Sequence, residues 1–250
     1  PGEPAWLDFA LYAEGEIAQQ LCILCWKTWN GYPPHMGPTP CERDPPRFHI
    51  PAAENCLVRM RRNDCVRRKN EISGSYRELF RTATDQIIIA STYFLPGKEF
   101  RTGIWKAAHR GVIIKLVLAG TSDVWIAKQA ERYMYRWLLK NNIEVYEYQP
   151  SILHAKMTIC DGKWLTLGSY NLNNISAFAS IELNLDVNNE PFARSVKEKI
   201  EGIIAKDCVR ITMDNLITKN TLWQRLWQAI CYESIRILFY LFTFYFKQKE

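Results

Sequence analysis

Histidine is scarce in this chain, and its scarcity limits where imidazole chemistry can occur. The 250 residues contain four histidines, which are His35, His49, His109 and His154. The first two lie in a proline-rich stretch, and His109 precedes a glycine that we expect to end a helix. Only His154 is followed two residues later by a lysine. A site that combines imidazole and ammonium must therefore be sought at His154.

Groups of metal ligands are also lacking. Cys22 and Cys25 form a CxxC pair inside an apolar helical run, but no second pair of ligands is suitably spaced nearby. Buried or free thiols are the simpler interpretation. The chain also has no cluster of carboxylates and histidines with the spacing of a metal site. We therefore expect neither a metal nor a cofactor.

Long apolar runs are absent as well. The run Ile237–Phe246 is shorter than the roughly 20 apolar residues that a membrane-spanning helix needs. No signal peptide is visible at the start. The aromatic composition of the run, with Lys247 and Lys249 behind it, fits an anchor at a membrane interface. A C-terminal helix packed on the protein's own core is the alternative.

The charge is moderately basic. The net charge is +6 and the pI is about 8.9, which suits an anionic partner such as phospholipid or nucleic acid, or an ordinary solvated surface. A basic run over Arg59–Lys69 has the same two interpretations, a phosphate-contacting surface or a solvated loop. Hydrophobic residues make up 48% of the chain, which predicts a packed globular core.

Strand and helix patterns alternate from about residue 73, which predicts parallel pairing and a layered α/β fold. Asp161-Gly162 between two alternating runs predicts a hairpin turn. The predicted strands are Leu7–Tyr12, Gln86–Ser91, Val112–Leu118, Ile143–Tyr148, Ala155–Cys160, Lys163–Leu167 and Ile181–Val187. The predicted helices are Glu14–Trp29, Ser75–Thr84, Lys98–His109, a helix capped by Ser122 and Asp123 that runs to about Leu139, and Pro191–Lys206.

The first hairpin strand carries the candidate chemistry. His154 and Lys156 point to the same face, about 7 Å apart along the strand. Across the hairpin, Ser169 and Asn171 bring a hydroxyl and an amide toward the same place, and Glu182 on the next strand can reach toward the histidine.

These groups match what phosphodiester cleavage requires. Neutral imidazole can attack phosphorus and form a covalent phosphohistidine. The ammonium and the amide can stabilise the charge on the phosphoryl oxygens. A carboxylate on the other ring nitrogen selects the reactive tautomer.

The run HAKMTICDGKWLTLGSYNLN, residues 154–173, resembles the HKD motif of the phospholipase D superfamily in every defining position. STYFLP, RGVIIKLVLAG and IEVYEYQPSILHAKM extend the resemblance to the second half of bacterial cardiolipin synthases. The likeness is strong over Ile72–Lys206 and weak over Trp6–Trp29. It implies an α-β-α sandwich of the phospholipase D type. The predicted organisation is a remnant of a first lobe (1–30), a proline-rich linker with a basic loop (31–70), a catalytic lobe (71–206), and a C-terminal helical segment at a membrane or on the core (207–250).

The resemblance also implies a role for each residue of the motif. His154 would be the nucleophile or the general acid, and Glu182 would orient it. The phosphate would be bound by Lys156, Ser169 and Asn171. Asp161 belongs to the motif, but its position in a turn favours a structural role, which we also assign to Gly168.

The second catalytic histidine of two-motif members is missing here. Either the chain is the C-terminal half of a longer enzyme, which its Met-less start favours, or two copies pair. We expect a phosphatidyltransferase that makes a cardiolipin-type phospholipid through phosphohistidine. The alternatives are a homodimeric phospholipase D-type hydrolase or nuclease, and a non-catalytic membrane-associated half. The expected partners are an anionic phospholipid, a membrane surface and a second HKD half, at the cytoplasmic face of a bacterial inner membrane.

Overall fold

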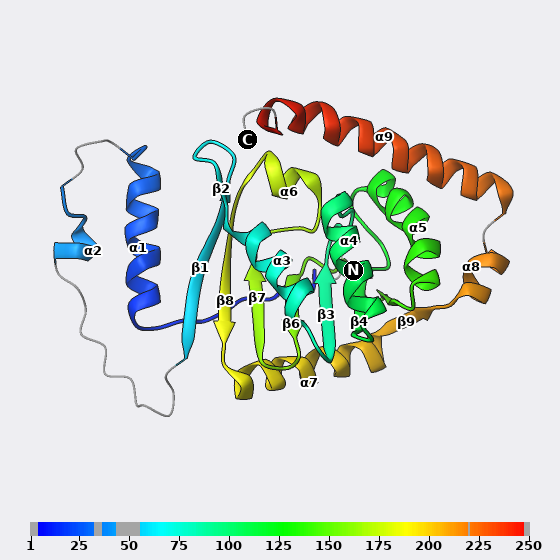
Figure 1. Ribbon diagram of the computed structural model, residues 1–250, viewed down its shortest axis with the longest axis horizontal. Helices are drawn as coiled ribbons and strands as arrows, with labels where there is room; N and C mark the ends of the chain where they lie inside the picture. Colours follow the sequence, from blue (N-terminus) through cyan, green and yellow to red (C-terminus); the bar gives the residue numbers. More distant parts are fainter. Residues whose placement is uncertain (1–4, 33–36, 44–55, 220, 248–250) are drawn as a thin grey trace.

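The computed structural model describes residues 5–32, 37–43, 56–219 and 221–247, and one nine-stranded sheet forms its centre (Figure 1). The strand order is β2-β1-β8-β7-β6-β3-β4-β5-β9. The strands are β1 (Leu57–Asp64), β2 (Lys69–Asn70), β3 (Gln86–Ser91), β4 (Ile113–Ala119), β5 (Glu144–Tyr148), β6 (Lys156–Cys160), β7 (Trp164–Gly168), β8 (Ile181–Asn188) and β9 (Cys208–Ile211).

The sheet is mixed. β3, β4 and β5 are parallel, as the alternation of strands and helices predicts, and the other neighbours pair antiparallel. The predicted hairpin is confirmed, because β6 pairs with β7 and Cys160 lies opposite Trp164 across the Asp161-Gly162 turn. The antiparallel pairing of β3 with β6 sets Ser91 opposite Lys156. The hairpin that carries the motif is thus in the middle of the sheet.

Helices cover both faces, so the predicted layered α/β architecture is confirmed. One core packs α3 (Glu71–Thr82), α4 (Lys98–His109) and α5 (Trp125–Lys140) against side chains such as Ile87 and Leu116. The other core lies under α7 (Glu190–Asp207) and includes Ile88, Val117 and Met157. Alternate residues of β3 and β4 enter opposite cores, which explains why both strands are mostly apolar.

The sheet extends past both ends of the expected catalytic lobe. Residues 57–64, which we assigned to a basic loop, form β1 and pair with β8 along its whole length. The arginines concealed this strand from the sequence pattern. Arg61 Nε donates to Asp186 Oδ2 on β8 at 3.1 Å, so a charge in the strand is matched by a charge in its neighbour. At the other end, β9 adds residues 208–211 beside β5.

The N-terminal part differs from the prediction in two ways. In the expected strand Leu7–Tyr12, only Leu7 forms a β-bridge, to Leu153. α1 (Glu16–Trp29) forms as predicted, but Cys22 is joined by a disulfide to Cys41 of α2 (Pro40–Arg43), where we expected free thiols. His35 and His49 lie outside the described residues.

The remaining helices follow the motif strands or close the chain. They are α6 (Asn174–Phe178), α8 (Met213–Lys219) and α9 (Leu222–Lys247). α9 packs on α5 and α6. None of the described helices is long and apolar enough to cross a membrane. Ser122 and Asp123 do not cap α5, whose first residue follows Val124, and Ser122 Oγ instead accepts from Val124 N–H at 3.1 Å.

Candidate active site

His154 lies just before β6 and is held by the N-terminal segment of the chain. Its backbone N–H donates to Leu7 C=O at 2.7 Å, and Leu7 N–H donates to Ile152 C=O at 2.9 Å. The Trp6 ring packs beside the imidazole at an interplanar angle of 46°, with the two ring centroids 5.4 Å apart. The position of His154 is thus fixed by backbone hydrogen bonds to the N-terminal segment and by a ring contact with Trp6.

Asp8 is the carboxylate that contacts the imidazole. Its Oδ2 lies 2.8 Å from His154 Nδ1, while Lys156 Nζ lies 2.9 Å from Nε2. Because an ammonium can only donate, Nε2 must be the unprotonated nitrogen in this arrangement. Nδ1 then carries the proton and donates it to Asp8. The two contacts together select the tautomer that has its lone pair on Nε2.

Lys156 is half-buried at the start of β6. Besides Nε2 of His154, its Nζ contacts the His154 carbonyl at 2.9 Å and Thr92 Oγ1 at 3.3 Å. Burial lowers the pKa of the Lys156 ammonium, and the negative charges of Asp8, Glu182 and Asp123 oppose that effect without reversing it. Three carboxylates therefore keep a cation in a partly desolvated place beside the imidazole.

Glu182 does not take the position that we expected beside the histidine. Its carboxylate accepts from Ser169 Oγ in a short hydrogen bond and from Ser180 Oγ at 2.8 Å. In this arrangement Asp8 contacts the imidazole, and the assignment of Glu182 as the orienting carboxylate of His154 stays a prediction. Glu182 is the second residue of β8, two strands from β6, and its carboxylate is bound by Ser169, which follows the intervening strand β7.

Ser169 and Asn171 follow β7 at the same end of the sheet as Lys156. Ser169 N–H donates to Leu183 C=O at 3.0 Å, which continues the β7–β8 ladder. Asn171 leaves its side-chain Oδ1 buried without a hydrogen-bond partner among the described residues. The buried Oγ of Ser91, opposite Lys156, is also unpartnered there. Buried polar groups usually have partners, so these two are candidates to meet a polar ligand.

Gly168 and Asp161 serve the packing of the motif. Gly168 allows β7 and β8 to approach closely, and Asp161 links the hairpin turn to the backbone before β3. A Cβ on Gly168 would stand 2.1 Å from the Leu183 carbonyl oxygen, so only glycine fits between β7 and β8. Asp161 accepts hydrogen bonds from the backbone N–H groups of Thr84, Asp85 and Gln86, and from the Thr84 hydroxyl. These contacts support the structural role that we assigned to each residue.

Two contacts to the site were not expected from the sequence. Thr92 contacts Lys156 from the end of β3, and Asp8 contacts His154 from far along the chain. A signal for Asp8 existed. Leu7, Phe9 and Leu11 pack on the core beneath α7. In extended backbone successive side chains point to opposite sides, so Asp8 points away from that core.

A second imidazole is not found beside His154 in the part of the chain that the structure describes. His109 ends α4, where its Nδ1 contacts the Trp105 carbonyl at 2.9 Å. The described residues also contain no group of three or more potential metal ligands. The candidate site therefore consists of one imidazole, one ammonium and their hydroxyl, amide and carboxylate neighbours.

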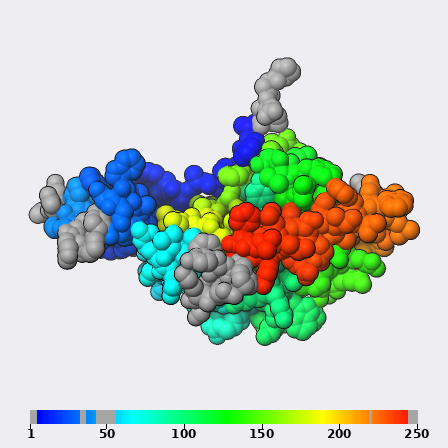
Figure 2. Space-filling model, turned by 90° about the horizontal axis from the view of Figure 1, so that it is seen from above, coloured from blue at the N-terminus to red at the C-terminus, as the bar shows by residue number. Residues whose placement is uncertain are grey.

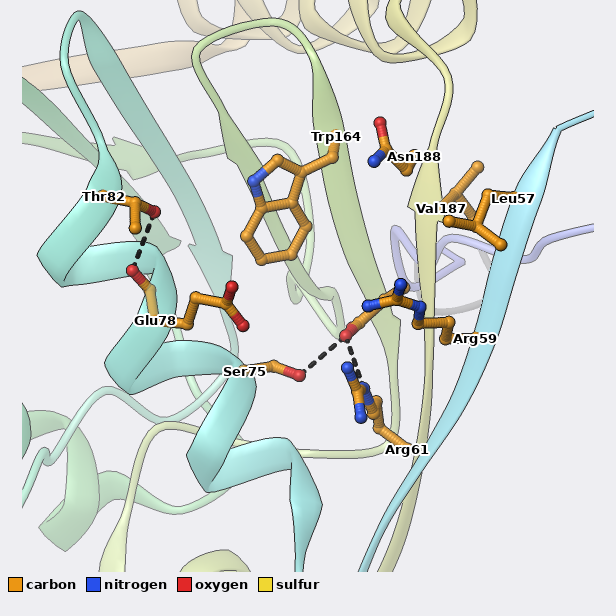
Figure 3. A pocket seen from close by; sticks show the side chains of 10 residues that line it. Leu57, Arg59, Arg61, Ser75, Glu78, Thr82, Trp164, Val187 and Asn188 are labelled. Carbon is orange, nitrogen blue, oxygen red and sulfur yellow. Dashed lines mark hydrogen bonds and ion pairs between the residues drawn. The ribbon is translucent and has the colours of Figure 1, made fainter.

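A separate cavity of about 130 Å³ lies between α3 and strands β1, β7 and β8 (Figure 3). Asp186 accepts there from Arg61 and from Ser75, with the Trp164 indole nearby. Trp164 starts β7 and Asn188 ends β8, whereas Ser169 and Glu182 lie at the opposite ends of these strands. The cavity is thus at the far end of the sheet from His154.

Known proteins resemble this chain in sequence and in fold. The family described as "Cardiolipin synthase, PLD-like domain" matches residues 76–204. Cardiolipin synthase B of Escherichia coli K12 is 31% identical over 240 residues, and that of Salmonella typhimurium LT2 is 30% identical over 241 residues. Each match covers 94% of this chain and 56% of the relative, so the chain spans about half the length of the curated relatives it matches.

Solved structures share the fold. The phospholipase D family member Nuc from Salmonella typhimurium superposes with a TM-score of 0.54 at 16% identity, covering 63% of this chain and 99% of Nuc. Phosphatidylserine synthase from Haemophilus influenzae gives a TM-score of 0.58 at 14% identity, covering 74% of this chain and 47% of the synthase. At these identities the likeness concerns the fold alone. With more than half of its residues matched by the family, the chain belongs to the cardiolipin synthase, phospholipase D-like domain family.

Proposed function

We propose that this chain supplies one half of the active site of a phosphatidyltransferase that forms a cardiolipin-type phospholipid. The observation that carries the proposal is the imidazole of His154, with Nδ1 on Asp8 and Nε2 beside Lys156. Similarity to cardiolipin synthase B along nearly the whole chain supports a phospholipid as substrate.

In the first step, Nε2 of His154 attacks the phosphorus of a phosphatidyl donor. A P–N bond forms, the P–O bond to the head-group alcohol breaks, and that alcohol leaves after taking up a proton. As Nε2 gives its lone pair to phosphorus, the ring becomes positively charged, and Asp8 stabilises that charge. Lys156 turns from Nε2 to the phosphoryl oxygens, where Asn171 and Ser169 also donate.

In the second step, the hydroxyl of an acceptor lipid attacks phosphorus. The P–N bond breaks, the P–O bond of the product forms, and the hydroxyl proton leaves to a base. The energy of the ester bond is kept in the P–N bond, so no nucleotide is consumed. The proton for the first leaving group requires an acid opposite His154, which we assign to a second HKD half.

That second half comes from a longer form of this protein or from a second copy. The extent of the match to cardiolipin synthase B favours the longer protein, since the chain covers 56% of those relatives. We place the enzyme peripherally at the cytoplasmic face of a bacterial inner membrane, with an anionic phospholipid as its substrate. The organisation into a first-lobe remnant, a linker, a catalytic lobe and a C-terminal segment belongs to the same proposal.

Covalent labelling tests the chemistry. The protein is incubated with a phosphatidyl donor that is radiolabelled in its phosphate, and His154→Ala is the matched variant. We expect an acid-labile, alkali-stable label on the parent protein and none on the variant. Turnover by His154→Ala at the parent's rate would refute the proposal.

A nuclease of the same fold is distinguished in the same preparation. Lipid transfer and plasmid cleavage are measured side by side with parent protein and His154→Ala. Lipid transfer without cleavage supports the transferase, whereas cleavage that depends on His154 without lipid transfer supports the nuclease. If gel filtration and cross-linking show an inactive monomer even when the upstream half is present, the chain is a non-catalytic half.

A further inference from the structure

α9 presents an unusual outer face. In a helix on the surface of a soluble protein, polar residues normally face outward. Here the residues three or four positions apart on the exposed side are almost all apolar: Trp223, Leu226, Trp227, Ile230, Ser234, Ile237, Leu238 and Leu241. We call these residues the outer stripe. Trp223 is 80% exposed, Ile237 56% and Leu241 65%.

The opposite side of α9 is the one that packs on the protein. Gln228, Cys231 and Thr243 are buried, and Tyr232 contacts both the Tyr133 ring, at 4.9 Å between centroids, and Arg101. The helix is therefore already docked by its inner side, and the outer stripe is not part of the core. It extends about 27 Å from Trp223 to Leu241, at 1.5 Å per residue.

The outer stripe continues onto the start of α5. The Trp125 and Trp227 rings lie 5.9 Å apart between centroids, and Trp125 and Ile126 are 56% and 50% exposed. These two residues follow Asp123 in sequence. The exposed apolar surface thus joins α9 to the loop that leads into α5.

That loop borders the candidate active site. The charge of Asp123 acts on Lys156, and Tyr93 OH donates to Asp123 Oδ1 at 2.6 Å. On its other flank α9 packs on α6, which begins three residues after Asn171. Figure 2 shows α9, orange to red, across the face seen from above, with the blue N-terminal segment behind it on the same face. α9 and the N-terminal segment that holds His154 are thus both visible from this side of the molecule.

We propose that the outer stripe, with Trp125 and Ile126, docks the protein in the interface of an anionic phospholipid bilayer. α9 lies parallel to the membrane plane, and the site at its edge receives lipid head groups from the same leaflet. This deepens the proposed function and rests on it for the identity of the substrate. The chemistry of the helix favours a bilayer, because Trp and Tyr are enriched at lipid interfaces. Within the described side chains, α9 also carries Arg225 and Arg236 against the single acid Glu233, which pairs with Arg236 at 2.6 Å, so the remaining positive charge of Arg225 complements anionic lipid.

Vesicle flotation with a matched pair of variants tests the docking. Ile230→Asp changes the outer stripe, and Ile113→Asp changes a residue of equal exposure at the start of β4, 48% against 47%. The vesicles contain phosphatidylcholine with a minority of phosphatidylglycerol. We expect parent protein and Ile113→Asp to float alike, and Ile230→Asp to bind about tenfold more weakly or worse, since a charge in the apolar layer is costly.

Leu241→Asp at the other end of the outer stripe gives an independent reading if one variant fails to fold. Equal flotation of the parent and both stripe variants would overturn the proposal. So would stripe variants that only dissociate a dimer in gel filtration, which would make the face an interface between chains. His154→Ala should float like the parent because docking needs no catalysis. Labelling of the stripe variants by a short-chain, water-soluble donor reports separately on the proposed function.

Discussion

Asp8 Oδ2 lies 2.8 Å from His154 Nδ1, although 146 positions separate the two residues in the chain. The contact joins the N-terminal segment, which precedes α1, to the motif at the start of β6. A carboxylate at this nitrogen determines which ring nitrogen carries the proton, and the nitrogen left free is the one that faces Lys156. We therefore expect the reactivity of the motif to depend on a residue outside it.

Asp8→Asn should lower the rate of His154 labelling by about 100-fold, because an amide can donate to Nδ1 and shift the proton to Nε2. Nitrogen-15 NMR of the imidazoles, with His154→Ala to assign the signal, should show the change of tautomer directly. Glu182→Gln is the matched control. It removes a carboxylate that contacts Ser169 and Ser180 rather than the ring, and should leave the tautomer unchanged. A tautomer shift in Glu182→Gln and none in Asp8→Asn would reverse the two assignments.

The comparison between sequence and structure has a consistent physical pattern. β3 and α4 begin and end at the predicted residues, because their apolar periodicity and flanking turn residues are local features. The hairpin turn follows from Asp161-Gly162 in the same way. Local patterns therefore located the motif and the central strands of the fold.

The failures concern long-range pairing. The arginines of β1 predict a solvated loop, and only its neighbour β8 reveals the matching Asp186. Family resemblance assigns Glu182 to His154, and this stays a prediction, whereas the contact with Asp8 depends on how the folded chain brings the N-terminal segment to the motif. Neither Asp8 nor Asp186 has a sequence pattern that names its partner.

The pH dependence of labelling should report the pKa of Lys156. Burial lowers that pKa below the usual lysine value. As pH rises, Lys156 should therefore lose its proton, and the labelling rate should fall, at a lower pH than for an exposed lysine. Asp123 opposes the shift, so Asp123→Asn should lower the pKa further and move the alkaline limb to lower pH. Asp214→Asn on α8 removes an equal charge that does not act on Lys156 and should leave the limb in place. A limb that moves upward in Asp123→Asn would contradict the assignment.

Asp161→Ala should destabilise the fold by about 2 kcal/mol at neutral pH, since a charged acceptor of several hydrogen bonds is lost. Burial alone would raise the pKa of Asp161, but the hydrogen bonds from Asp85, Thr84 and Gln86 outweigh it and lower the pKa. A lowered folded pKa means that the contribution is complete above the unfolded value of about 4 and is lost as pH falls through the folded value.

Urea unfolding of the parent and Asp161→Ala should therefore differ most at neutral pH and converge in acid. Glu198→Ala on α7, an exposed acid, should change little at either pH. Labelling per folded molecule should survive in Asp161→Ala. Lys156 begins β6, whereas residue 161 follows the last residue of β6, so the two lie at opposite ends of the strand. Loss of labelling in a folded Asp161→Ala protein would give this residue a part in the chemistry.

Gly168→Ala should be severely destabilising, by about 3 kcal/mol or enough to prevent folding. The new Cβ would stand 2.1 Å from the Leu183 carbonyl oxygen and 2.4 Å from Asn184 Oδ1, and the backbone of β8 cannot retreat without breaking its ladder with β7. Gly202→Ala on α7 is the control, because nothing lies within 4 Å of the added methyl and alanine favours the helix. Thermal unfolding should show a lower midpoint for Gly168→Ala and an unchanged or higher one for Gly202→Ala. Equal midpoints in both variants would mean that strand packing does not require the motif glycine. Gly168 would then be expected to matter for catalysis rather than for stability.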